Sequence, residues 1–218
     1  HGLLRAGERD QVEGDYARGM GIRVVTCDES ERFLSALAGV SDPETKRKTI
    51  GEEFIRAFER ESKKLGTVDF LAQGTIYPDC IESGKGDADT IKTHHNKVKM
   101  PEDVQFLGLV EPLCDLFKDE VRKVGTMLGI PKELVWRQPF PGPGLGVRIL
   151  GEITADKIKV LQEADWVLRD EMAKNGYEKE MAQFFCVLPC VKTVGVMGDH
   201  RTYDHLVAIR AVTTDDFM

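Results

Sequence analysis

The segment Pro139-Phe140-Pro141-Gly142-Pro143-Gly144 divides this sequence of 218 residues into two parts with different secondary-structure patterns. Three prolines and two glycines within six residues exclude both a helix and a central strand, because proline has no backbone N–H to donate. We therefore predict a stiff connector over residues 139–146. Residues 1–138 then form one predicted domain, and residues 147–218 form a second, smaller one.

Before the connector, short β-branched runs alternate with amphipathic helical stretches. Residues 22–27 and 68–72 are predicted strands. A helix with an apolar stripe is expected from Pro43 onward, and Ser41 and Glu44 have the spacing of a capping box at its start. This alternation predicts an α/β fold in which helices cover both faces of a parallel sheet.

After the connector the pattern changes to that of an α+β module. A short strand is predicted over residues 147–150 and a long helix over 154–174. Three apolar strands follow, at 184–188, 191–197 and 206–212. A module of this size has too little volume to cover so many apolar strands, so we expect residues 147–218 to form a homodimer.

Composition limits the class of protein. The net charge of -7 argues against a protein that coats nucleic acid, although basic loops can still hold a small anion. The five cysteines include no CxxC pair, which argues against a zinc site or a disulfide framework. No signal peptide or membrane-spanning run is visible, so a cytoplasmic protein without a membrane partner is expected. Neither end has a natural start or a closing element, and we expect the chain to be incomplete at both.

One candidate site follows the strand predicted at 68–72. The turn from Gly74 to Asp79 lies where ligands bind in open α/β sheets, beyond the carboxyl end of a strand. Asp79 and Glu82 are three residues apart and can face one Mg²⁺. A surface turn with solvated acids is the alternative interpretation.

Three further polar groups allow both a functional and a structural interpretation. Lys92, His94 and His95 suit a polyphosphate, or else form an exposed basic loop. Lys118 opens the helix predicted at 117–129, facing either a cleft or solvent. Asp199 and Arg201 follow a glycine-bracketed turn; they can read a nucleotide, or the glycines simply make a tight hairpin.

Taken in order, several motifs resemble successive landmarks of the GMP synthetases: GLLRAGE, ERFLSALAGVSDPETKRKTIGEEF, GTIYPD, IKTHHN, EPLCDLFKDEVRKVG, WRQPFPGPGLGVRILGE and VGVMGDHRTYDHLVAIRAVT. The resemblance covers nearly the whole chain, and its FPGPGL element is highly specific. It implies an N-type ATP pyrophosphatase domain followed by a dimerisation domain. The family's first strand and phosphate loop would then lie upstream of His1.

The resemblance also implies an activity. Such enzymes adenylylate XMP at its C2 oxygen with ATP and Mg²⁺, and then aminate it with ammonia from a glutaminase domain or subunit. The residues that it implicates fall into four groups: Asp79 (also a Mg²⁺ ligand) and Glu82 in activation, Lys92, His94 and His95 on a lid, Lys118 and Gly74 at the ATP phosphates, and Arg5, Asp199 and Arg201 at XMP.

Two alternatives remain. Another enzyme on the same scaffold, such as an NAD synthetase or a tRNA-thiolating enzyme, would be expected to lack FPGPGL and the module after it. A non-catalytic dimerising module would have no reason to keep the polar residues of 79–95 together.

Overall fold

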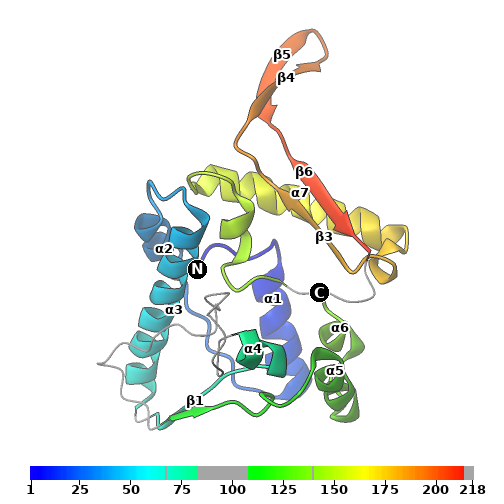
Figure 1. Ribbon diagram of the computed structural model, residues 1–218. Coiled ribbons are helices and arrows are strands. Elements are labelled where there is room, and N and C mark those ends of the chain that lie inside the picture. The colour runs from blue at the N-terminus through cyan, green and yellow to red at the C-terminus, as the bar shows by residue number, and fades with distance from the viewer. Residues whose placement is uncertain (67, 83–107, 139, 214–218) are drawn as a thin grey trace. The chain divides into compact units, whose positions relative to one another are not determined.

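The computed structural model describes residues 1–66, 68–82, 108–138 and 140–213 (Figure 1). Contacts between residues divide the chain into two units, one made of 1–50 with 138–218 and the other of 51–137. This division differs from the domains predicted from the sequence, because the first fifty residues pack with the segment that follows the connector. The predicted domain boundaries stay a prediction.

The first unit holds most of the secondary structure. Its elements are α1 (Glu8–Val12), the π-helical η1 (Glu13–Gly19), α2 (Ser30–Ala36), the start of α3 (Pro43–Leu65), the 3-10 turn η2 (Gly144–Arg148), α7 (Ala155–Lys174), the 3-10 turn η3 (Tyr177–Lys179), β3 (Gln183–Val187), β4 (Lys192–Met197), β5 (His200–His205) and β6 (Ala208–Val212).

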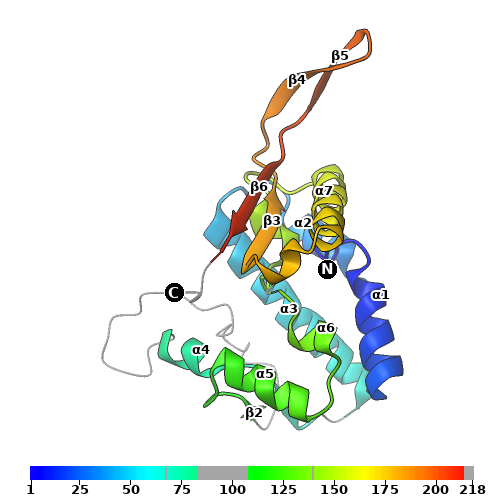
Figure 2. The same ribbon diagram turned by 90° about the vertical axis from the view of Figure 1, so that its right-hand side faces the viewer.

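The strands of this unit form two separate antiparallel pairs. β3 pairs with β6, with Phe185 opposite Arg210, and α7 lies along this pair. β4 and β5 form a hairpin with Val194 opposite Tyr203. In two views at right angles, this hairpin projects away from α7 (Figures 1 and 2). The strands predicted at 184–188, 191–197 and 206–212 and the helix at 154–174 are therefore confirmed.

Three predictions for this unit were wrong. Residues 147–150 are not a strand: 147 and 148 end η2, and beyond it Ile149 forms one isolated bridge with Leu188. Residues 200–205 form the unpredicted β5, so the order is helix and four strands instead of β-α-β-β-β. Residues 22–27 are not a strand; Ile22 and Val25 are half exposed, since β-branched residues favour strands only where a partner strand covers them.

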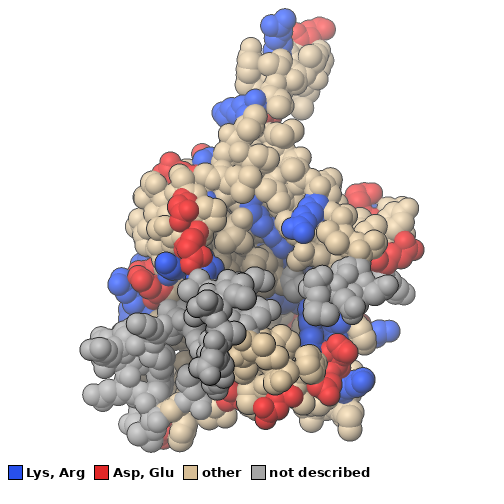
Figure 3. All heavy atoms as spheres, viewed as in Figure 1, with Lys and Arg blue, Asp and Glu red and all other residues tan. Residues whose placement is uncertain are grey.

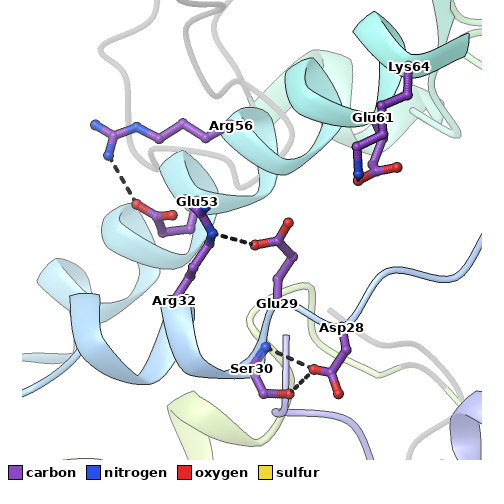
Figure 4. A network of polar contacts seen from close by, with 8 residues as sticks. All are labelled: Asp28, Glu29, Ser30, Arg32, Glu53, Arg56, Glu61 and Lys64. Carbon is purple, nitrogen blue, oxygen red and sulfur yellow. Dashed lines mark hydrogen bonds and ion pairs between the residues drawn. The ribbon is translucent and has the colours of Figure 1, made fainter.

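Helix starts are set by local side chains. α3 begins at Pro43, and Asp42 caps it by accepting hydrogen bonds from the backbone N–H and hydroxyl of Thr45, both at 2.7 Å. The predicted cap at Ser41 is thus one residue too early. At α2, Asp28 accepts two hydrogen bonds from Ser30, from its N–H at 3.0 Å and its hydroxyl at 2.5 Å (Figure 4).

The apolar core of the first unit joins its N-terminal segment to the residues after the connector. The fully enclosed apolar side chains come from both: Leu3, Phe33, Leu37, Ile50, Leu145, Ile149, Leu161 and Leu188. Lys46 is also buried, and its ammonium donates hydrogen bonds to the carbonyl oxygens of Ile149, at 2.7 Å, and of Gly151. The start of α3 is therefore fixed to the turn after η2 by a buried cation as well as by packing.

The second unit contains the rest of α3 and a parallel strand pair. Its other elements are β1 (Phe70–Ala72), α4 (Tyr77–Glu82), β2 (Gly108–Val110), α5 (Lys118–Met127) and α6 (Lys132–Val135). β1 and β2 are parallel, with Leu71 opposite Leu109, in keeping with a mixed α/β fold. The helix predicted at 117–129 is confirmed as α5, and Leu128, which follows its last residue, is 74% exposed. Within the described ranges, no helix is long and apolar enough to cross a bilayer.

Candidate functional site

The first candidate site lies at the carboxyl ends of the two parallel strands in the second unit. Gln73 extends the pair by donating its N–H to the carbonyl of Val110 at 2.9 Å. Next along the chain, buried Thr75 donates its hydroxyl to Glu111 Oε1 at 2.6 Å. The segments after β1 and β2 are therefore tied together at the edge where ligands bind in parallel α/β sheets.

Asp79 lies in the first turn of α4, directly after this edge. Its Oδ2 accepts the backbone N–H of Ile76 at 3.0 Å, which stabilises the start of the helix. Gly74 precedes it in the extended link from β1, where a missing side chain lets a ligand approach the backbone. The alternative interpretation expected solvated acids in this turn, whereas Asp79 stabilises the turn through this hydrogen bond; its functional role stays a prediction.

Lys118 is the first residue of α5, whose start contacts the start of α4. The N–H of Tyr77 donates to the carbonyl of Leu116 at 2.9 Å, and the rings of Tyr77 and Phe117 meet edge to face at 5.0 Å. These contacts bring the starts of α4 and α5 together. Burial lowers the pKa of Lys118, and the nearby positive charge of Arg122 lowers it further. Gly74, Asp79 and Lys118 thus belong to segments that the structure brings together.

The remaining predicted residues of this site are not tested by the structure. Lys92, His94 and His95 lie outside the described residues, and Glu82 ends α4 without a described side chain. Among the described residues no three His, Cys, Asp or Glu side chains gather as a metal cluster. Mg²⁺ is commonly held by one or two carboxylates together with substrate phosphates, so Asp79 as a Mg²⁺ ligand stays a prediction.

The second candidate site is a buried group of charges in the first unit, centred on Arg5. The Arg5 side chain is 5% exposed, and its Nε lies 3.5 Å from Asp165 Oδ2. Its guanidinium stacks on the ring of Phe140, 4.3 Å from the centroid. Its backbone N–H donates to Glu8 Oε2 at 3.1 Å, so both its main chain and its side chain are held.

Arg148 lies beside Arg5 and shares its carboxylate. Its Nη1 donates to Asp165 Oδ1 at 3.3 Å, and its guanidinium is 4.3 Å from the centroid of Phe185. Phe140 contacts this second guanidinium too, at 5.3 Å. Two arginines, two aromatic rings and one aspartate therefore make a compact, nearly enclosed group.

The hydrogen-bonding capacity of Arg5 is largely unused. Its Nε is buried without a hydrogen-bond partner, and its guanidinium donates no hydrogen bond to any described residue. Burial lowers the pKa of Arg5 to about 10, with Arg169 adding to the effect, so the side chain remains a cation at neutral pH. An enclosed cation with spare donors is suited to an anionic oxygen ligand.

Sequence reasoning missed Arg148, Asp165 and Phe140 as members of this group. Arg148 and Asp165 carried signals. Arg148 is the one charged residue in the run Gly144 to Leu150. Asp165 follows Ile158 and Leu161 on the buried stripe of α7, where a carboxylate is stable only with charged or hydrogen-bonding partners.

The structure does not bring Asp199 and Arg201 to this buried group. Asp199 lies in the turn that joins β4 to β5 and Arg201 at the start of β5, and both are exposed. The hairpin carries them away from α7 and β3 (Figures 1 and 2). At its end the visible face bears acidic and basic side chains beside one another, whereas most of the hairpin is uncharged (Figure 3).

Comparison with known proteins supports the resemblance inferred from the motifs. The family model "GMP synthase C terminal domain" matches residues 170–218. Proteins named GMP synthase (glutamine-hydrolysing) are similar over all 218 residues, with 60% identity in Finegoldia magna, 59% in Ligilactobacillus salivarius and 57% in Acetivibrio thermocellus. The chain spans 42, 42 and 43% of these relatives' lengths, respectively.

Proposed function

This chain resembles the GMP synthases throughout its length, and we propose that it is the part of such an enzyme in which XMP is activated and aminated. The first predicted domain would be an N-type ATP pyrophosphatase, and residues 147–218 a dimerisation domain. The parallel pair of β1 and β2, with polar residues at its carboxyl edge, supports the first assignment. The family match over residues 170–218 supports placing a separate C-terminal domain at the end.

The proposed reaction has two steps. The C2 oxygen of XMP attacks the α-phosphorus of ATP, forming adenylyl-XMP and releasing pyrophosphate. Ammonia then adds to C2, and the C2–O bond breaks to release AMP, so that GMP remains and a proton is lost. A carbonyl oxygen is a poor leaving group and AMP is a good one. The protein must therefore align the two nucleotides and exclude water from the activated intermediate.

In the second unit, we assign the ATP side of the reaction to the edge formed by Gly74, Asp79 and Lys118. Gly74 would let the backbone approach the phosphates, and Lys118 would offset their charge. Mg²⁺, held by Asp79 together with phosphate oxygens, would neutralise the polyphosphate. The other residues of this assignment rest on the resemblance alone: Glu82 in activation, and Lys92, His94 and His95 on the lid.

The observation that carries the proposal for XMP is the state of Arg5. It is an enclosed cation whose guanidinium donates no hydrogen bond to a described residue. An anionic nucleotide would supply both the missing acceptors and the missing negative charge. Asp199 and Arg201 belong to the proposed XMP site by resemblance alone, since both are exposed on the β4–β5 hairpin and do not join the group around Arg5.

The remaining parts of the proposal concern partners. Ammonia would come from a glutaminase domain or subunit, as the names of the relatives indicate for those proteins. A homodimer would cover the exposed apolar side chains of the β4–β5 hairpin, among them Val194, Val196 and Tyr203. We propose a cytoplasmic protein without a nucleic-acid or membrane partner.

The test uses the full-length protein with ATP, Mg²⁺, XMP and ammonium, and measures AMP, pyrophosphate and GMP. We expect release of AMP that depends on XMP, with an equal amount of GMP. Asp79→Asn should reduce this release roughly 100-fold or more, with little change in melting temperature, because asparagine can still accept the Ile76 hydrogen bond. Asp119→Asn, on the exposed surface of α5, is the matched control. AMP release that is independent of XMP would reject the proposed substrate.

A further inference from the structure

We propose that Asp165 is a positioning residue for nucleotide binding, which holds the guanidinium of Arg5 in place through its buried carboxylate. The proposal rests on the proposed function, because it takes Arg5 as a contact to XMP. Asp165 itself is 1% exposed, so it acts through Arg5 and not on the ligand.

The geometry starts from one face of α7. Gln162, Asp165 and Arg169 recur at i, i+3 and i+7, so they share a side of the helix. Gln162 donates its amide to the carbonyl of Leu4 at 2.7 Å, which fixes the backbone next to Arg5. One turn further along, Asp165 meets the Arg5 side chain. The same helix face therefore holds both the main chain and the charge of this segment.

The charge balance explains why the carboxylate matters. Asp165 is the one acid that forms an ion pair with Arg5 or with Arg148 among the described residues. Arg169 lies close enough to disfavour the charged forms of both. The negative charge of Glu8 also favours the charged form of Arg5, but the hydrogen bond between its carboxylate and Arg5 comes from the Arg5 backbone N–H and not from the guanidinium. Without Asp165, mutual repulsion would drive the arginines apart.

Three groups surround the Asp165 carboxylate: the Arg148 guanidinium, the Cys186 backbone N–H and the Arg5 guanidinium. Oδ1 accepts from Arg148 at 3.3 Å and from the backbone N–H of Cys186 at 3.4 Å, while Oδ2 faces Arg5 without a hydrogen bond. The anchoring bonds thus hold the carboxylate, and its second oxygen attracts Arg5 by charge alone. Arg5 keeps its N–H groups for an incoming anion, which a bidentate pair would have occupied.

The experiment is steady-state kinetics of the full-length protein with Asp165→Asn, which keeps the side-chain volume and removes the charge. We expect the KM for XMP to rise about 10-fold, while the KM for ATP stays within twofold. Adding Arg5→Met to Asp165→Asn should cause no further rise beyond that of Arg5→Met alone, because both act through one contact. Asp170→Asn, on the same helix and paired with Lys174, is the control that should leave both KM values unchanged.

If Asp165→Asn does not fold, the double variant Asp165→Asn/Arg148→Met replaces it, because it keeps the net charge of the group formed by Arg5, Arg148 and Asp165. The proposal then predicts weak XMP binding in a stable protein, and normal XMP affinity in that variant would overturn it. An unchanged KM for XMP in a folded Asp165→Asn protein, or losses that simply add with those of Arg5→Met, would overturn it while leaving the proposed function intact. Failure of the unsubstituted protein to bind XMP would overturn both.

Discussion

The FPGPGL segment should not tolerate a methyl group at Gly144. This glycine has φ of +62°, and a Cβ built on it would lie 2.4 Å from the carbonyl oxygen of Leu3. The contact is to backbone, so no side chain can rotate away to relieve it. Gly144→Ala must therefore push the Leu3 segment off η2, or leave the left-handed region altogether.

The magnitude follows from three contributions. Alanine in the left-handed region costs about 1 kcal/mol. Moving the Leu3 carbonyl also breaks its hydrogen bond from the N–H of Leu145, now 2.8 Å, which contributes about 1 kcal/mol. Displacing the fully buried Leu3 side chain adds about 1 kcal/mol more. We expect a total of roughly 3 kcal/mol, and a weaker hold on Arg5 two residues later.

Hydrogen exchange of α7 in the full-length protein measures this loss directly. A destabilisation of that size should speed exchange of its protected amides roughly 100-fold. Gly142→Ala is the matched control, since its Cβ would meet no atom within 4 Å and its φ is not positive. Exchange rates in Gly144→Ala that match those of Gly142→Ala would refute the reasoning about backbone contact.

Two other expectations concern buried side chains, and a third concerns the proposed dimer. Lys46→Met should lower the free energy of unfolding, measured in urea, by roughly 2–4 kcal/mol because two carbonyl oxygens lose their donor. Lys48→Met, at an exposed position on the same helix, is the control and should change it little. Burial raises the pKa of Cys186 from 9.0 to about 11, so the folded thiol stays protonated where an unfolded one ionises; its alkylation followed by mass spectrometry should be negligible at pH 9 and rise toward pH 11. Rapid labelling of native protein at pH 8 would contradict that burial. Val196→Lys should convert the proposed dimer to monomers in sedimentation velocity, and undiminished dimer would place the interface elsewhere.

Some parts of the fold could be predicted because they depend on neighbours along the chain. α7 begins after Thr154, whose hydroxyl accepts the N–H of Lys157 at 3.4 Å, and the helix predicted over 154–174 starts at that residue. β3 and β4 were visible as apolar runs between turn residues. The resemblance to the GMP synthetases could be found from the motif series because it depends on residue order alone. That resemblance extended to the positions of candidate site residues, but not to their contacts.

Other parts depended on partners distant in sequence. Residues 22–27 have the composition of a strand, yet no strand in the described residues pairs with them. Contacts between residues 1–50 and those after the connector are also set by folding, and the domain boundary at the connector stays a prediction.

The sequence by itself determined the family resemblance, the long helices and the residue types available for chemistry. Only the tertiary structure decided that Asp165, 160 residues after Arg5 along the chain (165 − 5), pairs with it in the interior. It likewise decided that Lys46 is a buried donor and not a solvated charge. The physical reason is that a charged side chain is stable inside a protein only when partners surround it, and those partners are assembled by folding rather than by order along the chain.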